Sequence, residues 1–328
     1  MTILLTGGSG FLGSHIAEQL SLAGRRVRAL VRKSSDTALL KTLDQVELYE
    51  GALDDPASLR GAVEGATAII HSAGLVKARS SEEFHRVNAG GTENLVNAAL
   101  AANSPVTRFV LVSSLTVTGP SDSAGNPVTV TTEERPVTRY GRSKLAAERA
   151  VLAHRDELAS TIIRPPAIYG PRDREMLAFF QAVNRRILPY MGSPDSKLSI
   201  VYGPDAASAC IAAIDANVPS GSKFFIDDGA VYTAADLGAA IEQALARRAL
   251  LRVPLPARLL RTAAAAVELY GHVADRAMMF TPDKCNELFE QWVCDSSGTG
   301  EALAWQPKVR FEEGARLTAS WYRRHGWL

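Results

Sequence analysis

A cluster of glycines near the start of the chain restricts its fold more than any other feature. The apolar run at 3–6 predicts a strand, and residues 12–23 have the pattern of a helix. Between them lie Gly7, Gly10 and Gly13, in a GxxGxxG arrangement. Glycines here allow a tight turn and let backbone N–H groups approach a phosphate, which the helix N-terminus also attracts. In this context the spacing predicts a dinucleotide-binding loop, with a plain strand-to-helix turn as the alternative.

The first half of the chain repeats this alternation of strand and helix. Short apolar runs without polar alternation are typical of parallel strands that are covered on both faces. We predict strands at 3–6, 27–31, 46–49, 68–71, 108–113 and 160–164, and helices at 12–23, 55–63, 88–102 and about 139–154. This order predicts an α/β fold with a doubly wound parallel sheet, the Rossmann fold, whose ligand crevice lies at the carboxyl ends of the strands.

The residues after the second predicted strand indicate which dinucleotide binds. NAD-binding folds usually place a carboxylate roughly twenty residues beyond the glycine loop, on the ribose 2′-hydroxyl. Here Arg32 and Lys33 stand at that position, and the next acidic residue is Asp36. Two cations without a carboxylate suit a 2′-phosphate. We therefore predict NADP, with NAD as the second choice and a solvated basic turn as the alternative.

Prolines interrupt the pattern after Pro171 and divide the chain into short pieces. One further strand is predicted at 224–227, and one helix at 234–246. We therefore predict an NADP-binding Rossmann domain at 1–170, to which a segment at about 198–227 returns. The predicted substrate-binding region at 171–328 is smaller and mostly helical.

A Tyr/Lys pair is the best candidate for catalysis. Tyr140 and Lys144 are four residues apart, and so lie on one face of the predicted helix. A free tyrosine has a pKa of about 10, and a neighbouring ammonium lowers that pKa, so the pair predicts a phenol that works as a general acid or base. Ser113 and Ser114 end the fifth strand, where either hydroxyl could orient a substrate carbonyl; a plain strand-end turn is the alternative.

Six ordered segments make the chain similar to the extended short-chain dehydrogenase/reductase family, of the NAD-dependent epimerase/dehydratase type. They are TGGSGFLG at 6–13, HSAG at 71–74, NAGGT at 88–92, the two serines at 113–114, YGRSK at 140–144 and RPPAIYGP at 164–171. The resemblance covers nearly the whole chain, and 305–321 also resembles the closing helix of the family.

The resemblance implies a role for each of several residues. It selects Ser114 rather than Ser113, counting five residues back from Gly119, as the partner of the Tyr/Lys pair. It implies that Asn88 helps to hold the active-site backbone. Together with the arguments above, it gives a predicted cofactor site made of Gly7, Ser9, Gly10, Phe11, Leu12, Gly13, Arg32, Lys33, Leu53, Ala73, Gly74, Tyr140, Lys144, Pro165 and Ile168.

Departures from the family patterns narrow the reaction. Ala52 replaces the first Asp of a GDLxD segment that contacts adenine in the family, which predicts looser adenine recognition. Leu115 and Thr116 stand where sugar-nucleotide 4,6-dehydratases have acidic residues. Ala167 stands where many epimerases have an Asn that holds the sugar nucleotide. The strand at 27–32 resembles the dihydroflavonol-reductase and 3β-hydroxysteroid-dehydrogenase branch, whose members act on ketones and alcohols with apolar skeletons.

These observations predict an NADP(H)-dependent ketone reductase or secondary-alcohol dehydrogenase. Tyr140 would transfer the proton, Lys144 would lower the phenol pKa and hold the ribose, and Ser114 would orient the oxygen of a small-molecule substrate. A nucleotide-sugar epimerase with tightly held NAD is the first alternative, and a non-catalytic dinucleotide-sensing protein is the second. The sequence leaves the substrate, the direction of the reaction and the oligomeric state open, with a homodimer as one option.

Composition and charge argue against several other classes. Lys and Arg number 36 against 35 acidic residues, and this balance gives no reason to expect nucleic acid or an anionic membrane as a partner. The three cysteines lack disulfide or metal-ligand spacing, so we expect no metal site and a reducing, cytoplasmic location. We expect no targeting segment, and no membrane span, which would need an apolar run of ~18 residues. Residues 259–270 predict an amphipathic helix, which with 278–280 either lines an apolar pocket or packs in the core.

Overall fold

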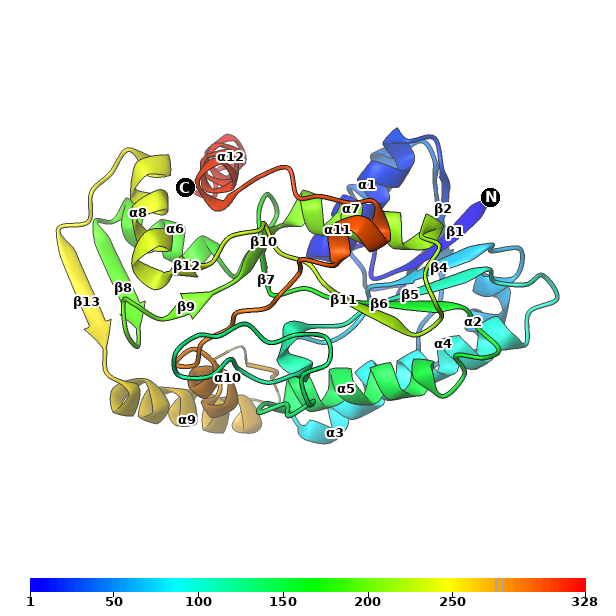
Figure 1. Cartoon of the computed structure of the whole chain (residues 1–328), viewed down its shortest axis with the longest axis horizontal. Helices are drawn as coiled ribbons and strands as arrows, with labels where there is room; N and C mark the ends of the chain where they lie inside the picture. The colour runs from blue at the N-terminus through cyan, green and yellow to red at the C-terminus, as the bar shows by residue number, and fades with distance from the viewer. Residues whose placement is uncertain (275, 279) are drawn as a thin grey trace.

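The computed structural model describes residues 1–274, 276–278 and 280–328, with the backbone alone at 272 and 273. Its centre is a parallel sheet with the strand order β11-β6-β5-β4-β1-β2-β3 (Figure 1). The strands are β1 (Thr2–Thr6), β2 (Arg26–Val31), β3 (Val46–Glu50), β4 (Ala68–His71), β5 (Arg108–Val112), β6 (Ser160–Arg164) and β11 (Ser222–Phe225). Since β1 pairs with both β2 and β4, the strand order reverses beside β1, where doubly wound folds bind their ligands.

Helices cover both faces of this sheet, as the unbroken apolar strands predict. Ile3 and Leu5 of β1 pack in one core with helices α1 (Phe11–Leu22) and α7 (Gly203–Asp215). Leu4, between them, points to the opposite face and joins a second core. The helices on that face are α2 (Pro56–Val63), α4 (Gly91–Leu100) and α5 (Arg139–Leu152). The predicted doubly wound α/β fold is therefore confirmed.

The later part of the chain builds a third core, in which Tyr169 packs against Phe311 with ring centroids 4.8 Å apart. Its helices are α6 (Leu177–Asn184), α8 (Ala234–Leu245) and α12 (Phe311–Arg324). Three two-stranded sheets join it: β7 (Ala167–Tyr169) with β10 (Ile200–Tyr202), β9 (Lys197–Leu198) with β12 (Tyr232–Thr233), and β8 (Ile187–Met191) with β13 (Leu251–Leu255). The predicted helical C-terminal region is present (Figure 1).

Several elements differ from the sequence predictions. The helix expected from residue 88 is preceded by α3 (Ser81–Phe84) and by η2 (His85–Gly90), a turn of π-helix that contains Asn88. The closing helix begins at Phe311 rather than near Trp305, because Trp305 follows the short helix α11 (Thr299–Leu303) and its indole donates a hydrogen bond to Ser208. The remaining elements are η1 (Leu40–Thr42), η3 (Leu115–Val117), α9 (Ala257–Val273) and α10 (Pro282–Glu287).

Candidate active site

The glycine loop turns between β1 and α1, at the edge formed by the carboxyl ends of the strands. Gly7 has a φ of +75°, and a Cβ there would lie 2.6 Å from the backbone nitrogen of Ala73. A Cβ at Gly13 would lie 2.0 Å from the carbonyl oxygen of Gly7. Gly10 is the N-cap of α1, and no side chain caps this helix end. The loop therefore presents a helix N-terminus to an anion without side chains in the way, which fits the pyrophosphate of a dinucleotide.

The segments after β2 and β3 lie at the same edge. Arg32 and Lys33 are exposed directly after β2, where the backbone N–H of Arg32 donates to the Ser35 hydroxyl at 3.1 Å. Within the described part of the chain, neither cation is joined to a carboxylate. Leu53 follows β3, and its carbonyl accepts a hydrogen bond from the Asn94 side chain at 2.9 Å. Both segments are thus held by hydrogen bonds that leave the side chains of Arg32 and Lys33 available to a ligand.

Asn88 joins the loop after β4 to helix α5. Its Oδ1 accepts from the backbone N–H of Leu75 at 2.7 Å, and its Nδ2 donates to the Leu75 carbonyl at 3.0 Å and to the Ser143 hydroxyl at 2.9 Å. A Cβ at Gly74 would lie 3.1 Å from Asn88 Oδ1 and 3.8 Å from Lys144 Nζ. The buried amide therefore fixes the loop backbone next to the lysine.

Lys144 is anchored at the end of β5. Its Nζ donates to the carbonyl of Val112 at 2.5 Å. Burial lowers the pKa of this ammonium to about 8, and the carboxylate of Glu148 opposes the shift. The amine thus sits at the sheet edge, between the end of β5 and Gly74, and is partly deprotonated near pH 8.

The Tyr140 phenol is half-buried and strongly favours its protonated form. Burial raises its pKa above the ordinary value, and the negative charges of Glu287 and Glu175 add to the shift. The side chain of Ser114 interacts with the phenol and opposes it. In this arrangement the Lys144 amine donates to the carbonyl of Val112, the last residue of β5, and the charges that act on the phenol are those of Glu287 and Glu175. The lowering of the phenol pKa by Lys144 stays a prediction.

The two serines that end β5 point in different directions. Ser113 is buried and donates to the carboxylate of Glu148. Ser114 is half-buried and caps η3, accepting from the backbone N–H and the hydroxyl of Thr116 at 3.2 and 2.9 Å. Because Ser114 is also the serine that interacts with the Tyr140 phenol, the geometry separates two residues that the strand pattern alone left equivalent.

The other predicted cofactor residues lie close by. Ser9 is exposed on the glycine loop, Phe11 is half-buried at the start of α1, and Leu12 is buried. Pro165 follows β6, and Ile168 is half-buried in β7. The structure therefore gathers the predicted residues at the carboxyl ends of β1 to β6.

Comparison with known proteins agrees with this architecture. Residues 3–226 match the family described as NAD dependent epimerase/dehydratase. The chain belongs to this family. It is an NAD(P)-dependent enzyme of the extended short-chain dehydrogenase/reductase type.

Two relatives and one solved structure illustrate the range of the family. The chain is 35% identical to a ceramide reductase from Caulobacter vibrioides, over 99% of this chain and 96% of that protein. It is 32% identical to a 3 beta-hydroxysteroid dehydrogenase/Delta 5-->4-isomerase from Mycobacterium tuberculosis, over 69% of this chain and 64% of that one. A dTDP-glucose 4,6-dehydratase from Streptomyces venezuelae with NAD bound shares the fold with a TM-score of 0.80 and 23% identity, covering 100% and 98% of the two chains. The similarity to reductases and dehydrogenases of lipids and sterols agrees with the resemblance noted in the sequence.

A buried ionic cluster lies beneath the site of this epimerase/dehydratase-family chain. Arg164 is fully buried and holds Glu148 through two bonds, Nε to Oε1 at 2.9 Å and Nη2 to Oε2 at 2.6 Å. The same guanidinium contacts Glu134 at 2.5 Å, and Lys223 contacts Glu134 at 2.7 Å. Glu148 is not among the predicted site residues, although it follows Lys144 at the same four-residue spacing that joins Lys144 to Tyr140.

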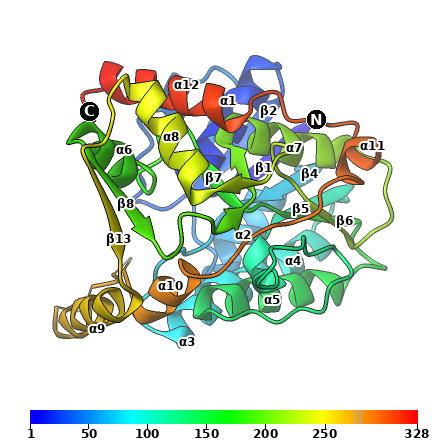
Figure 2. The ribbon, with the colours of Figure 1, turned by 60° about the vertical axis from the view of Figure 1, so that its left-hand side comes forward.

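Charged residues from the later part of the chain also reach the site. Helix α10 lies beside the start of α5 (Figure 2) and carries Glu287, whose Oε1 accepts from Lys284 Nζ at 2.8 Å. Glu287 and Glu175 both act on the Tyr140 phenol. No sequence motif indicates these residues, because Glu287 is 147 residues from Tyr140 and only the fold brings the two together.

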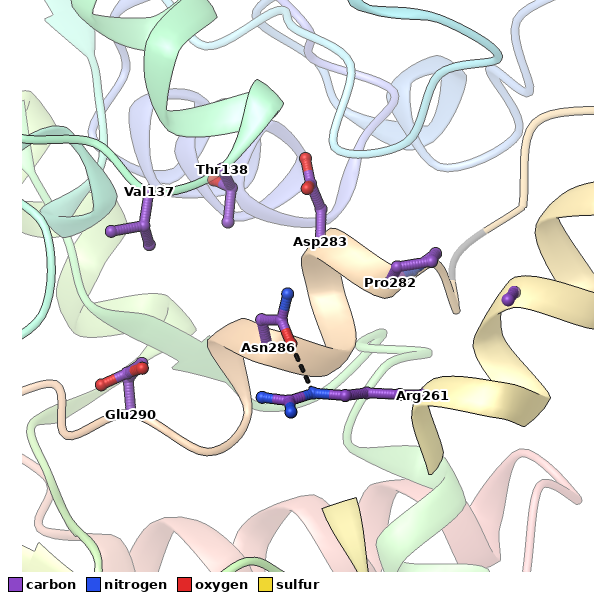
Figure 3. Close-up of a pocket in the computed structure, with 8 residues that line it drawn as sticks. Val137, Thr138, Arg261, Pro282, Asp283, Asn286 and Glu290 are labelled. Atoms are coloured by element: carbon purple, nitrogen blue, oxygen red, sulfur yellow. Dashed lines mark hydrogen bonds between the residues drawn. The ribbon is translucent and has the colours of Figure 1, made fainter. Parts of the chain in front are cut away.

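A cavity of about 580 Å³ opens on the outer side of α10, between α9 and the start of α5 (Figure 3). Arg261 crosses it, and its Nε donates to the side-chain oxygen of Asn286 at 2.8 Å. Its other polar lining residues are Thr138, Asp283 and Glu290. None of the residues that line it belongs to the predicted catalytic or cofactor set.

Proposed function

We propose that the protein is an NADP(H)-dependent reductase of a ketone, or dehydrogenase of the corresponding secondary alcohol, on an apolar small molecule. The observation that carries the proposal is the Tyr140 phenol beside the Ser114 hydroxyl, at the carboxyl edge of a dinucleotide-binding sheet, where burial raises the pKa of the phenol. A protonated phenol is the form that donates a proton to a carbonyl oxygen as the carbonyl carbon is reduced. Residues 171–328 would supply the substrate-binding region.

Each polar residue of the site has one task in this proposal. The cofactor, when bound, supplies or accepts the hydride. Ser114 orients the substrate oxygen, and Tyr140 donates a proton to it or removes one from it. Lys144 lies next to Gly74, where its amine would hold the nicotinamide ribose. Asn88 holds the backbone at Leu75 against α5, and so keeps these groups at a fixed separation.

The apolar character of the substrate rests on two independent lines of support. The names of both relatives described above refer to lipids, a ceramide and a 3β-hydroxysteroid. Ala167 is exposed at the start of β7 and carries no amide that could bind a sugar nucleotide. One lost hydrogen bond costs only about 0.5–1.5 kcal/mol, so Ala167 supports the choice without deciding it.

The alternative is a nucleotide-sugar epimerase with tightly held NAD, which the name of the family includes. A steady-state screen separates the two functions. It offers NADPH together with aryl ketones, steroids, β-keto compounds or UDP- and GDP-sugars. We expect turnover of an apolar ketone and none of the sugars. Epimerisation of a nucleotide sugar without net consumption of cofactor would replace our proposal with the alternative. Any turnover dismisses a non-catalytic dinucleotide sensor.

We expect NADPH to bind more tightly than NADH, and Arg32→Ala to narrow the difference. A charge-assisted bond from Arg32 to the 2′-phosphate contributes about 1.5–3 kcal/mol, or roughly 10–150-fold in affinity. Fluorescence titration of both cofactors measures the effect, and Arg26→Ala, at the opposite end of β2, serves as the matched control. Equal affinities of the unaltered protein for the two cofactors would mean that Arg32 and Lys33 form only a solvated turn.

A further inference from the structure

One end of the molecule, formed by β8, β13 and α9, combines exposed apolar side chains with an excess of arginine; we call it the arginine end. Figures 1 and 2 both show these three elements side by side, away from the central sheet. Residues 185–191 and 246–267 contain seven arginines and no aspartate or glutamate. Because the whole chain is nearly neutral, its net charge gives no sign of this local excess of arginine.

Helix α9 has an apolar face without a partner in the described structure. Leu259, Ala263, Ala266 and Tyr270 recur at helical spacing and are all exposed. The exposed fractions of Leu259 and Tyr270 are 60% and 58%, and Leu269, beside Tyr270, reaches 67%. The opposite face, with Ala264, packs against the protein. The exposed face of α9 is therefore not packed in a core, whereas Arg261 and Ala265 of the same helix line the cavity described above. The prediction for 278–280 includes residue 279, which lies outside the described residues.

The same end carries further exposed apolar residues and unshielded cations. Leu250, just before β13, and Leu251, its first residue, are 77% and 56% exposed, and Ile187 pairs with Leu251 across the two strands. Arg258 is exposed at the start of α9, with no carboxylate partner in the described residues. The single acidic residue of α9, Glu268, bonds to Arg139 of α5. Arg252 of β13 is paired with Glu242, so the positive charge offered to a partner comes from exposed arginines such as Arg258.

We propose that the arginine end docks on the surface of a bilayer that contains anionic lipid. An amphipathic helix with an apolar face and arginines beside it lies in the interface plane, where the apolar side chains enter the headgroup region and the arginines meet the lipid phosphates. Among the described residues no helix is long and apolar enough to cross a membrane, so α9 would lie on the bilayer. Because the ion pair between Glu268 and Arg139 joins α9 to the start of the Tyr140 helix, docking would place that end of the helix near the bilayer.

Flotation of the full-length protein with vesicles tests this proposal. One set contains phosphatidylcholine alone, and the other phosphatidylcholine and phosphatidylglycerol in equal parts. We expect binding to the mixed vesicles that weakens in high salt, and little binding to phosphatidylcholine alone. Leu259→Asp with Tyr270→Asp should reduce the partition coefficient by at least about tenfold, because two apolar anchors are lost. Leu22→Asp, on α1 and 83% exposed, is the matched control and should bind normally.

Arg258→Gln separates charge from apolar contact: it should weaken binding to the mixed vesicles only. Absence of binding to mixed vesicles, equal binding of the two vesicle types, or normal binding of the α9 double variant would each overturn the proposal. Sedimentation velocity tests whether a second copy of the chain occupies this face instead. If the unaltered protein is a dimer and the α9 double variant is a monomer, the face is assigned to a second copy. Circular dichroism confirms that each variant is folded. Since binding is measured without turnover, the outcome does not depend on the proposed reductase activity.

Discussion

Replacing Tyr140 with Phe is expected to lower turnover by at least ~100-fold, the usual contribution of a general acid or base. The variant removes one oxygen and leaves the ring, so the contact with Phe84, whose ring centroid lies 6.1 Å from that of Tyr140, is retained. Cofactor affinity should therefore stay close to that of the unaltered protein. Steady-state kinetics with the ketone identified by the screen measure the first effect, and fluorescence titration the second.

A matched control for this substitution is Tyr190→Phe, in β8, which removes a hydroxyl from another largely buried tyrosine. It should leave turnover unchanged. Ser114→Ala should also reduce turnover, because the substrate oxygen loses its orienting hydroxyl, while Ser113→Ala should act mainly on stability through Glu148. Near-normal activity of the Tyr140→Phe variant would remove Tyr140 from the mechanism.

Arg164→Ala is expected to lower the free energy of unfolding by about 3–5 kcal/mol, the cost of leaving a buried charge without its partner. Glu148 is fully buried, and the guanidinium of Arg164 is the cation that contacts it. Chemical denaturation followed by circular dichroism measures the loss. Arg25→Ala is a suitable control, because its ion pair with Asp215 is at the surface and such pairs contribute about 0–1 kcal/mol.

The double variant Arg164→Met with Glu148→Leu distinguishes two contributions to this loss of stability, the unpaired buried charge and the lost packing volume. It removes both charges and keeps most of the side-chain volume, so it should be clearly more stable than Arg164→Ala. If the double variant is as unstable as the single one, packing volume rather than the unpaired carboxylate sets the cost. A loss below about 1 kcal/mol for Arg164→Ala would place this pair with ordinary surface ion pairs.

The sheet could be predicted from the sequence because its signals are local. Most strands of the first half contain a short apolar run, and positive-φ Gly7 and the tightly packed Gly13 mark the turn that follows β1. Later elements gave weaker signals. Strand β13 contains an arginine and a proline, Arg252 and Pro254, among its five residues. Its pairing with β8 joins residues that are far apart in the sequence. Such short strands become visible only when the fold supplies their partners.

The residues of the candidate site also divide into those that the sequence indicates and those that only the fold brings together. Tyr140, Lys144 and Ser114 lie in recognisable segments, and the structure brings their elements to one edge of the sheet. Glu287 and Glu175 have no sequence signal, yet their negative charges raise the pKa of the phenol. A spacing of four residues predicted that Tyr140 and Lys144 share a helix face, but it could not predict that the Lys144 amine would bond to the carbonyl of Val112 at the end of β5.

The π-helical turn η2 limits how the length of this part of the chain can vary in evolution. It joins α3 to α4 without a break, and one residue in an α-helix corresponds to a rotation of about 100°. Loss of a single residue from 85–90 would therefore turn Asn88 away from Leu75 and Ser143, or else turn the whole of α4 on the sheet. Substitutions of exposed side chains such as Arg86 leave the rotation of Asn88 and α4 about the helix axis unchanged. Insertions and deletions here should accordingly be much rarer than substitutions, so the number of residues is itself a functional property of the segment.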